Sequence, residues 1–344
     1  MEFRLAFIGF GVVGQGLAEI LVQDKEKLEK EQNFHFKVVA ISDKLKGSIY
    51  NANGINLAKV LAIAREKKSL ETYDDAQLRG WDSIQTITDS NANVIVEVSW
   101  TDIATGEPAI THVKTALGLK KHVIMTNKGP IALAGSELLA LAKKNGVQIK
   151  FEGTVLSGTP AINLGMNNLA GAGVTEILGI VNGTTNYILS EMEKGLDYDQ
   201  ALKQAQELGY AEADPSGDVE GWDALGKVVI ITSTIMNYPM TKKQVEREGI
   251  TNITKADVEQ AKKEGKRWKL IASSKINEDG TITASVRPMK LPLDNPLASV
   301  MGPINALTFK TKYLGDITIV GPGAGKEATG FALLADLLEI NSFF

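Results

Sequence analysis

The stretch that decides the fold is Gly9-Phe10-Gly11-Val12-Val13-Gly14, which follows a short apolar run from Phe3 to Ile8. Glycines at these three positions allow a tight turn, close approach of the backbone to a pyrophosphate, and close packing of a helix on a strand. The next residues, Val12 to Leu21, have the apolar spacing of a helix, whose N-terminus offers free N–H groups to phosphates. A purely structural glycine turn is the alternative. Because the motif follows a strand and opens a helix, we expect a dinucleotide site contacted by Gly9, Gly11, Val12, Val13 and Gly14.

Short apolar strands alternate with amphipathic helices over roughly the first 150 residues. Further strands are expected at 36–41, 94–98, 123–126 and 147–151, with helices at about 108–119 and 133–144. This alternation predicts βαβ units, a parallel sheet and right-handed crossovers. We therefore expect an α/β protein whose residues 1–150 form a Rossmann-type dinucleotide-binding domain. A C-terminal helix at 327–340 is expected to return to this domain, which would be completed by about 321–344.

The regular alternation of strands and helices does not continue in residues 151–320. For this segment we expect an α+β domain for substrate binding, catalysis and dimerisation. Expected helices begin at about Pro160, at Thr185, after the cap Asp197, and at Asp218, the last continuing to Met236. Strands are expected at 174–181, 281–286, 307–310 and 317–320.

Composition narrows the chemistry. The chain has 344 residues, 44% of them hydrophobic and 23% charged, with a formal net charge of −4, so neither nucleic acid nor an anionic membrane is the expected partner. No signal peptide and no membrane-length apolar run is evident, and a cytoplasmic location is expected. There is no cysteine, which excludes disulfides, thiolate metal sites and thiol nucleophiles.

Two charged positions border the predicted cofactor site. Asp43 follows the second expected strand, where an acidic residue bonds the ribose 2′-hydroxyl and favours NAD. Lys44 and Lys46 could instead reach a 2′-phosphate and favour NADP, so the sequence leaves the preference open. Lys128, in a loop after the strand 123–126, is expected at the carboxyl edge of the sheet, where it could bind a carboxylate or donate to a carbonyl oxygen; an ordinary exposed lysine is the alternative.

The densest group of polar residues is Gly209-Tyr210-Ala211-Glu212-Ala213-Asp214-Pro215, followed by Asp218, Asp223 and Lys227. Asp223 and Lys227 are four residues apart on an expected helix, so their side chains share one face. A carboxylate beside a lysine orients the ammonium, which can protonate the oxygen of an aldehyde as hydride arrives. A surface ion pair of about 0.3–0.5 kcal/mol would have the same spacing.

Taken together, these segments resemble the homoserine dehydrogenase family. The matching segments are GFGVVG (9–14), TNK (126–128), EGTVLSGTP (152–160), NGTTNYIL (182–189) and LGYAEADPSGDVEGWDALGK (208–227), in the family's order and spacing. The resemblance implies NAD(P)-dependent interconversion of L-aspartate 4-semialdehyde and L-homoserine in threonine, methionine and isoleucine biosynthesis, by a homodimer that pairs through a sheet of the second domain.

The resemblance also implies roles for individual residues. Lys227 would donate the proton, with Asp223 orienting it and Lys128 assisting, and Glu212 would take the substrate amino group. Further substrate contacts would come from Asp223, Tyr210, Gly183, Thr184 and Asp218, and further cofactor contacts from Ser99, Lys128, Gly209 and Gly325. Glu152 with the carbonyl groups of Val155, Ser157 and Thr159 resembles the family's monovalent cation site, expected to take Na⁺; a structural turn is the alternative.

Two departures from relatives are expected to matter. The chain ends at Phe344, so allosteric inhibition through the C-terminal ligand-sensing domain of many relatives is not expected, and no aspartokinase segment precedes the core. Trp100 stands where the family tends to have small polar residues.

Other enzymes fit less well. Aspartate-semialdehyde dehydrogenase needs a cysteine, and lactate- or malate-type dehydrogenases need a catalytic histidine, whereas His122 falls in an expected strand. A dehydrogenase for another amino acid lacks this set of motifs. A non-catalytic NAD(P)-sensing protein would have lost Lys128, Lys227 or the carboxylates around them, and all are present.

Overall fold

In a computed structural model that describes residues 2–102 and 104–344, the chain divides into two compact units. Residues 1–158 and 325–344 form the first unit, and residues 159–324 form the second. Residues 1 and 103, which belong to the expected first domain, lie outside the described residues. No helix in the described part of the chain is long and apolar enough to cross a membrane.

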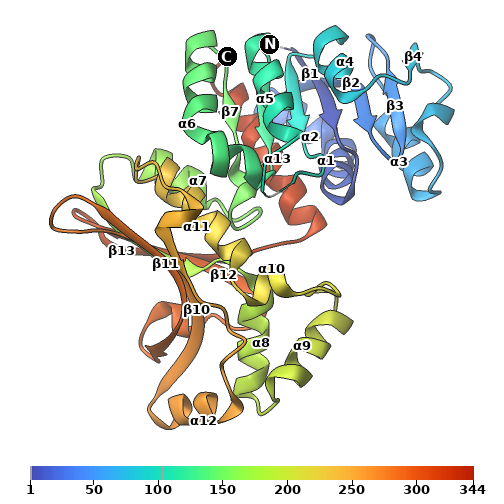
Figure 1. The fold of residues 1–344 in the computed structure, drawn as a ribbon. Helices are drawn as coiled ribbons and strands as arrows, with labels where there is room; N and C mark the ends of the chain where they lie inside the picture. Colours follow the sequence, from blue (N-terminus) through green and yellow to red (C-terminus); the bar gives the residue numbers. More distant parts are fainter. Residues whose placement is uncertain (1, 103) are drawn as a thin grey trace. The chain divides into compact units, whose positions relative to one another are not determined.

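The first unit is built on a seven-stranded sheet with the order β4-β3-β2-β1-β5-β6-β7 (Figure 1). Its parallel part consists of β1 (Glu2–Ile8), β2 (His35–Asp43), β5 (Val94–Glu97), β6 (His122–Met125) and β7 (Ile149–Lys150). The predicted parallel sheet is therefore confirmed. Two antiparallel strands next to β2, β3 (Gly47–Tyr50) and the edge strand β4 (Leu78–Arg79), were not predicted, because such short segments carry too little alternation to stand out.

The main helices of the first unit are α1 (Val12–Gln23), α2 (Lys25–Gln32), α3 (Leu57–Arg65), α4 (Ser83–Asp89), α5 (Ala109–Gly118), α6 (Lys128–Asn145) and α13 (Lys326–Asn341). The last of these confirms the predicted return of the C-terminal helix to the first domain, since α13 packs against α1. A Cβ atom on Gly16 would lie 2.4 Å from the carbonyl oxygen of Lys326, and one on Gly330 would lie 2.6 Å from the carbonyl carbon of Gly16. Only glycine at both positions permits so close a crossing.

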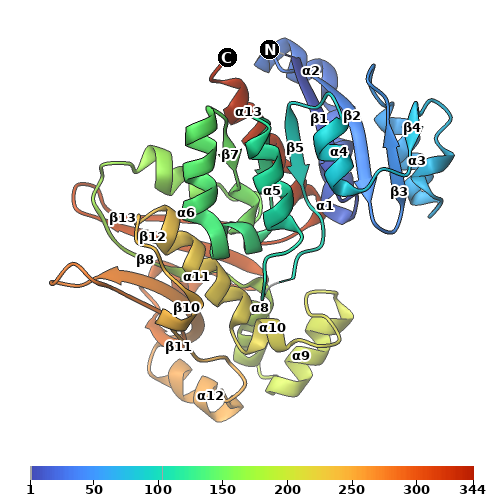
Figure 2. The same ribbon diagram turned by 45° about the horizontal axis from the view of Figure 1, so that its top comes forward.

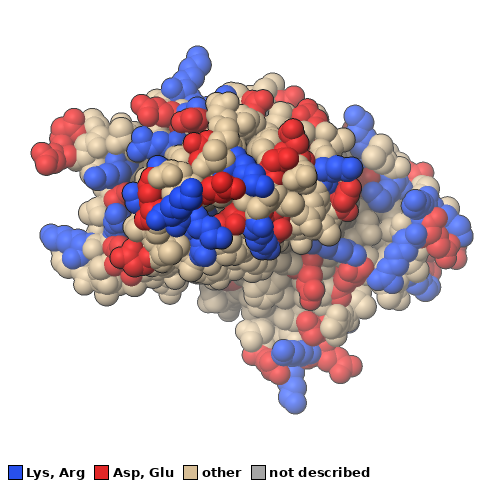
Figure 3. Space-filling view, turned by 90° about the horizontal axis from the view of Figure 1, so that it is seen from below, with Lys and Arg blue, Asp and Glu red and all other residues tan. Residues whose placement is uncertain are grey.

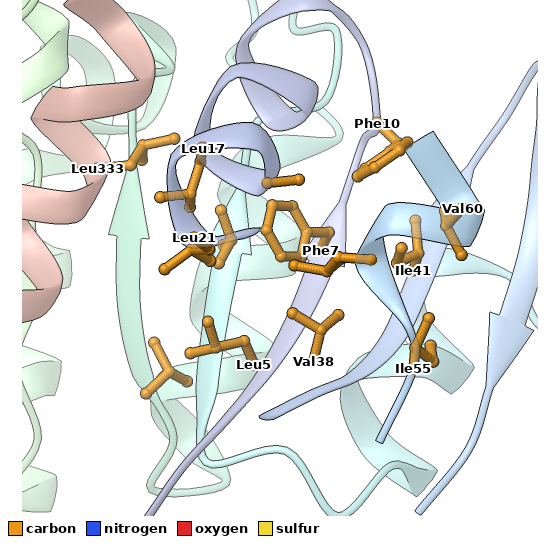
Figure 4. Close-up of a cluster of buried hydrophobic side chains, with 14 of the residues drawn as sticks. Leu5, Phe7, Phe10, Leu17, Leu21, Val38, Ile41, Ile55, Val60 and Leu333 are labelled. Atoms are coloured by element: carbon orange, nitrogen blue, oxygen red, sulfur yellow. The ribbon is translucent and has the colours of Figure 1, made fainter. Parts of the chain in front are cut away.

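The core of the first unit explains why the glycine loop has a fixed place (Figure 4). Phe7 and Phe10 are fully buried on either side of the loop's first glycine, with their ring centroids 5.8 Å apart in an edge-on arrangement. Leu17 of α1 and Leu333 of α13 complete the same cluster. Burial of each such side chain contributes about 1.5–3 kcal/mol, so the loop is anchored at both ends.

The second unit contains a six-stranded sheet with the order β13-β12-β8-β10-β11-β9. Its strands are β8 (Val174–Ile180), β9 (Val245–Arg247), β10 (Lys266–Ile276), β11 (Ile282–Pro292), β12 (Ile304–Thr311) and β13 (Gly315–Pro322). Its main helices are α8 (Gly183–Glu193), α9 (Tyr198–Glu207), α10 (Ser216–Val219), α11 (Trp222–Thr234) and α12 (Lys255–Lys263), seen in Figure 2. The α+β architecture is as predicted.

The second unit differs from the sequence-based expectation in several details, and α12 and β9 were not predicted. The single long helix expected from Asp218 to Met236 is divided into α10 and α11 by Gly221, whose φ of 85° lies in the left-handed region. The helix expected from Pro160 is only α7 (Ala161–Asn163), followed by a π-helical turn, Leu164–Asn168. Strand β10 was missed because charged residues interrupt its alternation, although it pairs with β11 along its whole length.

Charged side chains of both signs are intermingled on the face drawn in Figure 3, and neither sign forms a continuous patch there.

The second unit contains an ammonium group that is almost completely buried. Lys269 of β10 is 1% exposed, and its ammonium donates to Asn186 Oδ1 at 2.8 Å and to the Val300 carbonyl oxygen at 2.5 Å. Both of these oxygen acceptors are neutral, and burial lowers the pKa of Lys269 from 10.5 to about 8.

The burial of Lys269 predicts that the protein becomes more stable as the pH rises above about 8. The folded protein releases the Lys269 proton near pH 8, whereas the unfolded chain keeps it until about pH 10.5, so the unfolded state binds more protons between these values. The free energy of unfolding should therefore rise by about 3 kcal/mol over this interval relative to Lys269→Met, measured by urea unfolding at a series of pH values. Lys275→Met, at an exposed position of the same strand, should keep the wild-type slope. If the free energy of unfolding had the same pH dependence in the wild type and in Lys269→Met, the lowered pKa of Lys269 would be contradicted.

Candidate active site

The glycine loop of the first unit has the geometry of a phosphate cradle. Gly9 has a φ of 93°, and a Cβ atom there would lie 2.6 Å from the Val98 carbonyl oxygen and 2.7 Å from the Ser99 nitrogen. A Cβ on Gly14 would lie 3.0 Å from the Gly9 carbonyl oxygen, so this glycine lets α1 approach the strand closely. Gly11, at the N-cap of α1, has no atom within 4 Å of the position where a Cβ would lie. The open space at Gly11 beside a helix N-terminus fits the pyrophosphate of a dinucleotide.

Asp43, the last residue of β2, is hydrogen-bonded to that loop. Its Oδ2 accepts the Phe10 N–H at 2.7 Å, and its Oδ1 accepts the N–H groups of Leu45 and Lys46, each at 3.0 Å. The Lys46 ammonium lies 3.8 Å from the same carboxylate, and Lys44 is exposed. Sequence reasoning missed this structural role, because the bond to Phe10 joins residues 33 positions apart. The predicted bond from Asp43 to a ribose hydroxyl stays a prediction.

Lys128 lies at the start of a helix rather than in the loop that the sequence suggested. It is the first residue of α6, whose N-cap is Asn127, and Pro130 occupies the first turn, where its missing N–H is harmless. The expectation was wrong because the Gly-Pro pair reads as a loop although both residues are compatible with a helix start. An exposed lysine here faces the positive end of the helix dipole, an arrangement that costs about 0.3–1 kcal/mol. Lys128 therefore does not stabilise the start of α6 through the helix dipole.

The segment predicted to bind a cation contains a strained turn. Leu156 and Ser157 have φ values of 56° and 52°, which are unusual for residues other than glycine and cost about 1–3 kcal/mol each. The Ser157 hydroxyl hydrogen-bonds Thr329 Oγ1 at 2.7 Å. In the second unit, the Thr159 hydroxyl donates to the Pro322 carbonyl oxygen at 3.1 Å. Val155 is fully buried.

Glu152 begins this segment and is only 1% exposed. Its N–H donates to the carboxylate of Asp336, the nearest distance being 3.1 Å to Oδ2. Asp336 is fully buried, and burial, followed by the nearby Glu152 carboxylate, raises its pKa well above the usual range. In the described part of the chain, no group of three His, Cys, Asp or Glu side chains could hold a metal ion, so a cation here would depend largely on backbone carbonyl groups.

The second unit brings Lys227 and Asp223 together as their spacing predicts. The Lys227 Nζ lies 2.7 Å from Asp223 Oδ2, and it also donates to the Val181 carbonyl oxygen at 2.6 Å. Lys227 is 7% exposed, whereas Asp223 is half-buried. This pair is therefore not the exposed surface pair that formed the alternative, and its ammonium is held in one direction by two acceptors on different elements.

Asn182 connects this pair to a second carboxylate. Its Nδ2 donates to Asp218 Oδ1 at 2.7 Å and to Asp223 Oδ2 at 3.0 Å, while its Oδ1 accepts the Thr185 N–H that begins α8. Burial raises the pKa of Asp218, and the hydrogen bond from Asn182 opposes that shift. Sequence reasoning did not assign Asn182 a role in the site. Its position as an N-cap residue was the available signal.

The start of α8 also contacts the Gly209–Tyr210 turn. The Thr184 hydroxyl donates to the Tyr210 carbonyl oxygen at 2.7 Å, and the rings of Tyr187 and Tyr210 lie with centroids 4.9 Å apart. Gly183 begins the helix, and a Cβ on it would lie 2.9 Å from the Pro303 carbonyl oxygen. Gly209 has a φ of 75°, which ends α9 in a left-handed turn.

Other predicted site residues are not part of these networks. Glu212 is exposed, and its side chain makes no hydrogen bond or ion pair within residues 2–102 and 104–344. Gly325 precedes α13 in the first unit with a φ of 129°. Trp100 is 78% exposed.

The first unit thus has the fold and phosphate-binding loop of a dinucleotide-binding domain, and the second has a buried lysine–carboxylate pair suited to proton transfer. Together they define an NAD(P)-dependent oxidoreductase.

Comparison with known proteins makes the assignment specific. Residues 9–152 match the family model of the homoserine dehydrogenase NAD-binding domain, and residues 160–338 match that of homoserine dehydrogenase. The chain is 42% identical to the NAD(+)-dependent homoserine dehydrogenase of Pseudomonas canavaninivorans, over 99% of this chain and 96% of that protein. It is 41% identical to the homoserine dehydrogenase of Methanocaldococcus jannaschii, over 98% of both.

Solved structures of homoserine dehydrogenases have a similar fold. The putative homoserine dehydrogenase of Archaeoglobus fulgidus superposes with a TM-score of 0.88 at 39% identity, covering 98% of this chain and 99% of that one. A hyperthermophilic archaeal homoserine dehydrogenase in complex with NADPH superposes with a TM-score of 0.85 at 31% identity, covering 100% and 99%. The chain belongs to the homoserine dehydrogenase family.

Proposed function

We propose that the protein catalyses the reversible, NAD(P)-dependent reduction of L-aspartate 4-semialdehyde to L-homoserine. The reaction belongs to threonine, methionine and isoleucine biosynthesis, and we propose that it takes place in the cytoplasm. Membership of the family supports the reaction, and the observation that carries it is the buried Lys227–Asp223 pair. The nicotinamide cofactor supplies or accepts the hydride when bound.

Lys227 is the proposed proton donor to the aldehyde oxygen. As hydride reaches the carbonyl carbon, negative charge develops on that oxygen, and an ammonium group stabilises the charge and transfers its proton. In the reverse direction the amine accepts the hydroxyl proton of homoserine. The Asp223 carboxylate favours the charged ammonium and, with the Val181 carbonyl group, directs Nζ. Asp218 and Asn182 keep Asp223 in place through the shared amide.

The remaining site residues are proposed from the resemblance and from their positions. Glu212, exposed and without a partner of its own side chain among the described residues, can take the substrate ammonium group. Tyr210 and the first residues of α8, Gly183 and Thr184, are proposed as further substrate contacts, and Asp218 and Asp223 add negative charge. Lys128 would assist near the nicotinamide, and Ser99, Gly209 and Gly325 would contact the cofactor. The preference between NAD and NADP stays open.

The first experiment measures reduction of NAD⁺ and of NADP⁺ with L-homoserine. Lys227→Ala should lower kcat by about 10²- to 10⁴-fold, because it removes the general acid and base, while the Kd of the dinucleotide changes little. Glu212→Ala should mainly raise the KM for homoserine. Lys203→Ala, at an exposed position on α9, should behave as wild type.

Equal losses of turnover and of dinucleotide affinity in Lys227→Ala would refute the assignment of Lys227, and an unchanged KM in Glu212→Ala would count against that of Glu212. Tight dinucleotide binding with no turnover by the wild type would favour a non-catalytic NAD(P)-sensing protein or a dehydrogenase for another amino acid.

We also propose that Glu152 and the carbonyl groups of Val155, Ser157 and Thr159 bind a monovalent cation, Na⁺. The buried carboxylate of Glu152 and the left-handed Leu156–Ser157 turn support a site built mainly from carbonyl oxygens, which suits a weakly held hard cation. NaCl should therefore raise the Tm of the wild type above its value in tetramethylammonium chloride of equal ionic strength, and this difference should vanish in Glu152→Gln. A Tm that does not distinguish the two salts would contradict a bound cation.

A homodimer that pairs through the second unit's sheet is proposed as well. The edge strand β13 leaves Val320 53% exposed, and the adjoining turn leaves Tyr313 68% exposed. The unpaired backbone N–H and C=O groups of an edge strand are a template for pairing with another chain. Light scattering should give twice the chain mass of 37.0 kDa for the wild type and a single chain mass for Val320→Lys. Leu119→Lys, an exposed apolar position at the end of α5, should leave the mass doubled, and a monomeric wild type would contradict the proposal.

A further inference from the structure

A fully buried carboxylate, Glu97, ends strand β5 and has four hydrogen-bond contacts with three residues around it. Its Oε1 lies 2.9 Å from the Ser99 N–H, 2.5 Å from the Ser99 hydroxyl and 2.9 Å from Asn127 Nδ2. Its Oε2 lies 2.8 Å from Nδ1 of His112, which is 4% exposed. An ionised carboxylate has about four acceptor sites, so these four contacts satisfy it completely.

The carboxylate determines the direction of each hydrogen bond. Backbone N–H and amide NH₂ groups can only donate, so Oε1 is an acceptor and the Asn127 amide must turn its nitrogen toward Glu97. The Ser99 hydroxyl hydrogen is directed to Oε1 at 2.5 Å rather than to the Trp100 carbonyl oxygen at 3.4 Å. Because the Ser99 hydroxyl hydrogen is used by Glu97, only the lone pairs of Ser99 Oγ are left to accept a further hydrogen bond. The Asn127 Oδ1 is likewise an acceptor, and it has no hydrogen-bond partner among the described residues.

This cluster lies on the nicotinamide side of the sheet. β5 pairs with β1 on one side and β6 on the other, and Glu97 is opposite Ile8 and Met125 in the two registers. The Ser99 nitrogen is also one of the atoms that a Cβ on Gly9 would strike. In a doubly wound sheet the dinucleotide crosses the switch point, here between β1 and β5, at the carboxyl ends of the strands. Asp43 at the end of β2 marks the adenosine side, which leaves β5 and β6 for the nicotinamide.

We propose that Glu97 is a positioning residue that fixes Ser99 and Asn127 as hydrogen-bond acceptors for the amino group of the nicotinamide carboxamide, and that His112 holds Glu97 in place. The site then recognises the NH₂ of the carboxamide, and a carboxamide held through its NH₂ restricts rotation of the nicotinamide ring, as positioning for hydride transfer requires. Neither Glu97 nor His112 needs to touch the cofactor.

Binding of three dinucleotides in the absence of homoserine tests the inference. The probes are NAD⁺, 3-acetylpyridine adenine dinucleotide, which has a methyl group in place of the NH₂, and ADP-ribose, which has no nicotinamide. The wild type should bind NAD⁺ about tenfold more tightly than the acetylpyridine analogue, as expected for one or two lost hydrogen bonds. Isothermal titration calorimetry gives each Kd, and failure of homoserine turnover would not affect these values.

Variants of the cluster then separate positioning from a general structural role. Glu97→Ala should bring the ratio of the two Kd values close to one while the Kd for ADP-ribose stays at its wild-type value. Glu97→Gln should retain most of the preference, because its carbonyl oxygen can still accept from Ser99 and Asn127 while its NH₂ faces His112. Lys121→Met is the matched control, since Lys121 is also buried in this unit but donates to the Ile87 and Ser90 carbonyl oxygens, and it should keep the wild-type ratio.

Ser99→Ala is the milder variant for the case in which Glu97→Ala does not fold, because Ser99 is only half-buried, and it should lower the preference about three- to tenfold. The inference is overturned if the wild type binds NAD⁺ and the analogue equally. It is also overturned if Ser99→Ala and Glu97→Ala keep the full preference, or if they weaken ADP-ribose binding as much as they weaken NAD⁺ binding.

Discussion

The first unit depends on one close backbone contact, that of Gly9 against the Val98–Ser99 peptide. The glycine's positive φ turns the chain from β1 into α1, and the absence of a Cβ lets the turn lie on the end of β5. Two carboxylates secure this contact from opposite sides of the sheet's switch point. Asp43 holds the Phe10 N–H at the end of β2, and Glu97 holds Ser99 at the end of β5. The dinucleotide loop is thus fixed by strands that are neighbours of β1 in space but far from it in the chain.

Both units use carboxylates that are buried or half-buried in the same way, to hold donor groups. In the second unit, Asp223 and Asp218 share the Asn182 amide, and Asp223 in turn directs the Lys227 ammonium. A charge buried without partners would cost several kcal/mol, so each carboxylate is surrounded by N–H and O–H groups. Those groups lose their freedom to rotate, and the side chains that face a ligand are therefore preorganised.

Membership of the homoserine dehydrogenase family accounts for the pairing of these two arrangements in one chain. A hydride-transfer enzyme needs a rigid dinucleotide site and a proton donor whose direction is set before the substrate arrives. The glycine loop meets the first need through backbone geometry. We propose that the Lys227–Asp223 pair meets the second need, through an ion pair that is largely removed from water, where each interaction is stronger than on the surface.

The sequence by itself determined the parallel sheet, the glycine loop, the return of α13 and the Lys227–Asp223 pair. Each depends on a local pattern: apolar periodicity, glycine spacing, or two residues four apart on a helix. The tertiary structure decided the rest. Gly221 divides a helix that periodicity made continuous, and β10 is a strand because β8 and β11 pair with it despite its charges. Asn182 joins Asp218 to Asp223, and Glu97 joins Ser99 to Asn127. Three of these four hydrogen bonds span 30 to 41 positions of sequence. No local pattern encodes such contacts, because they arise only when separate strands and helices bring their ends to one place.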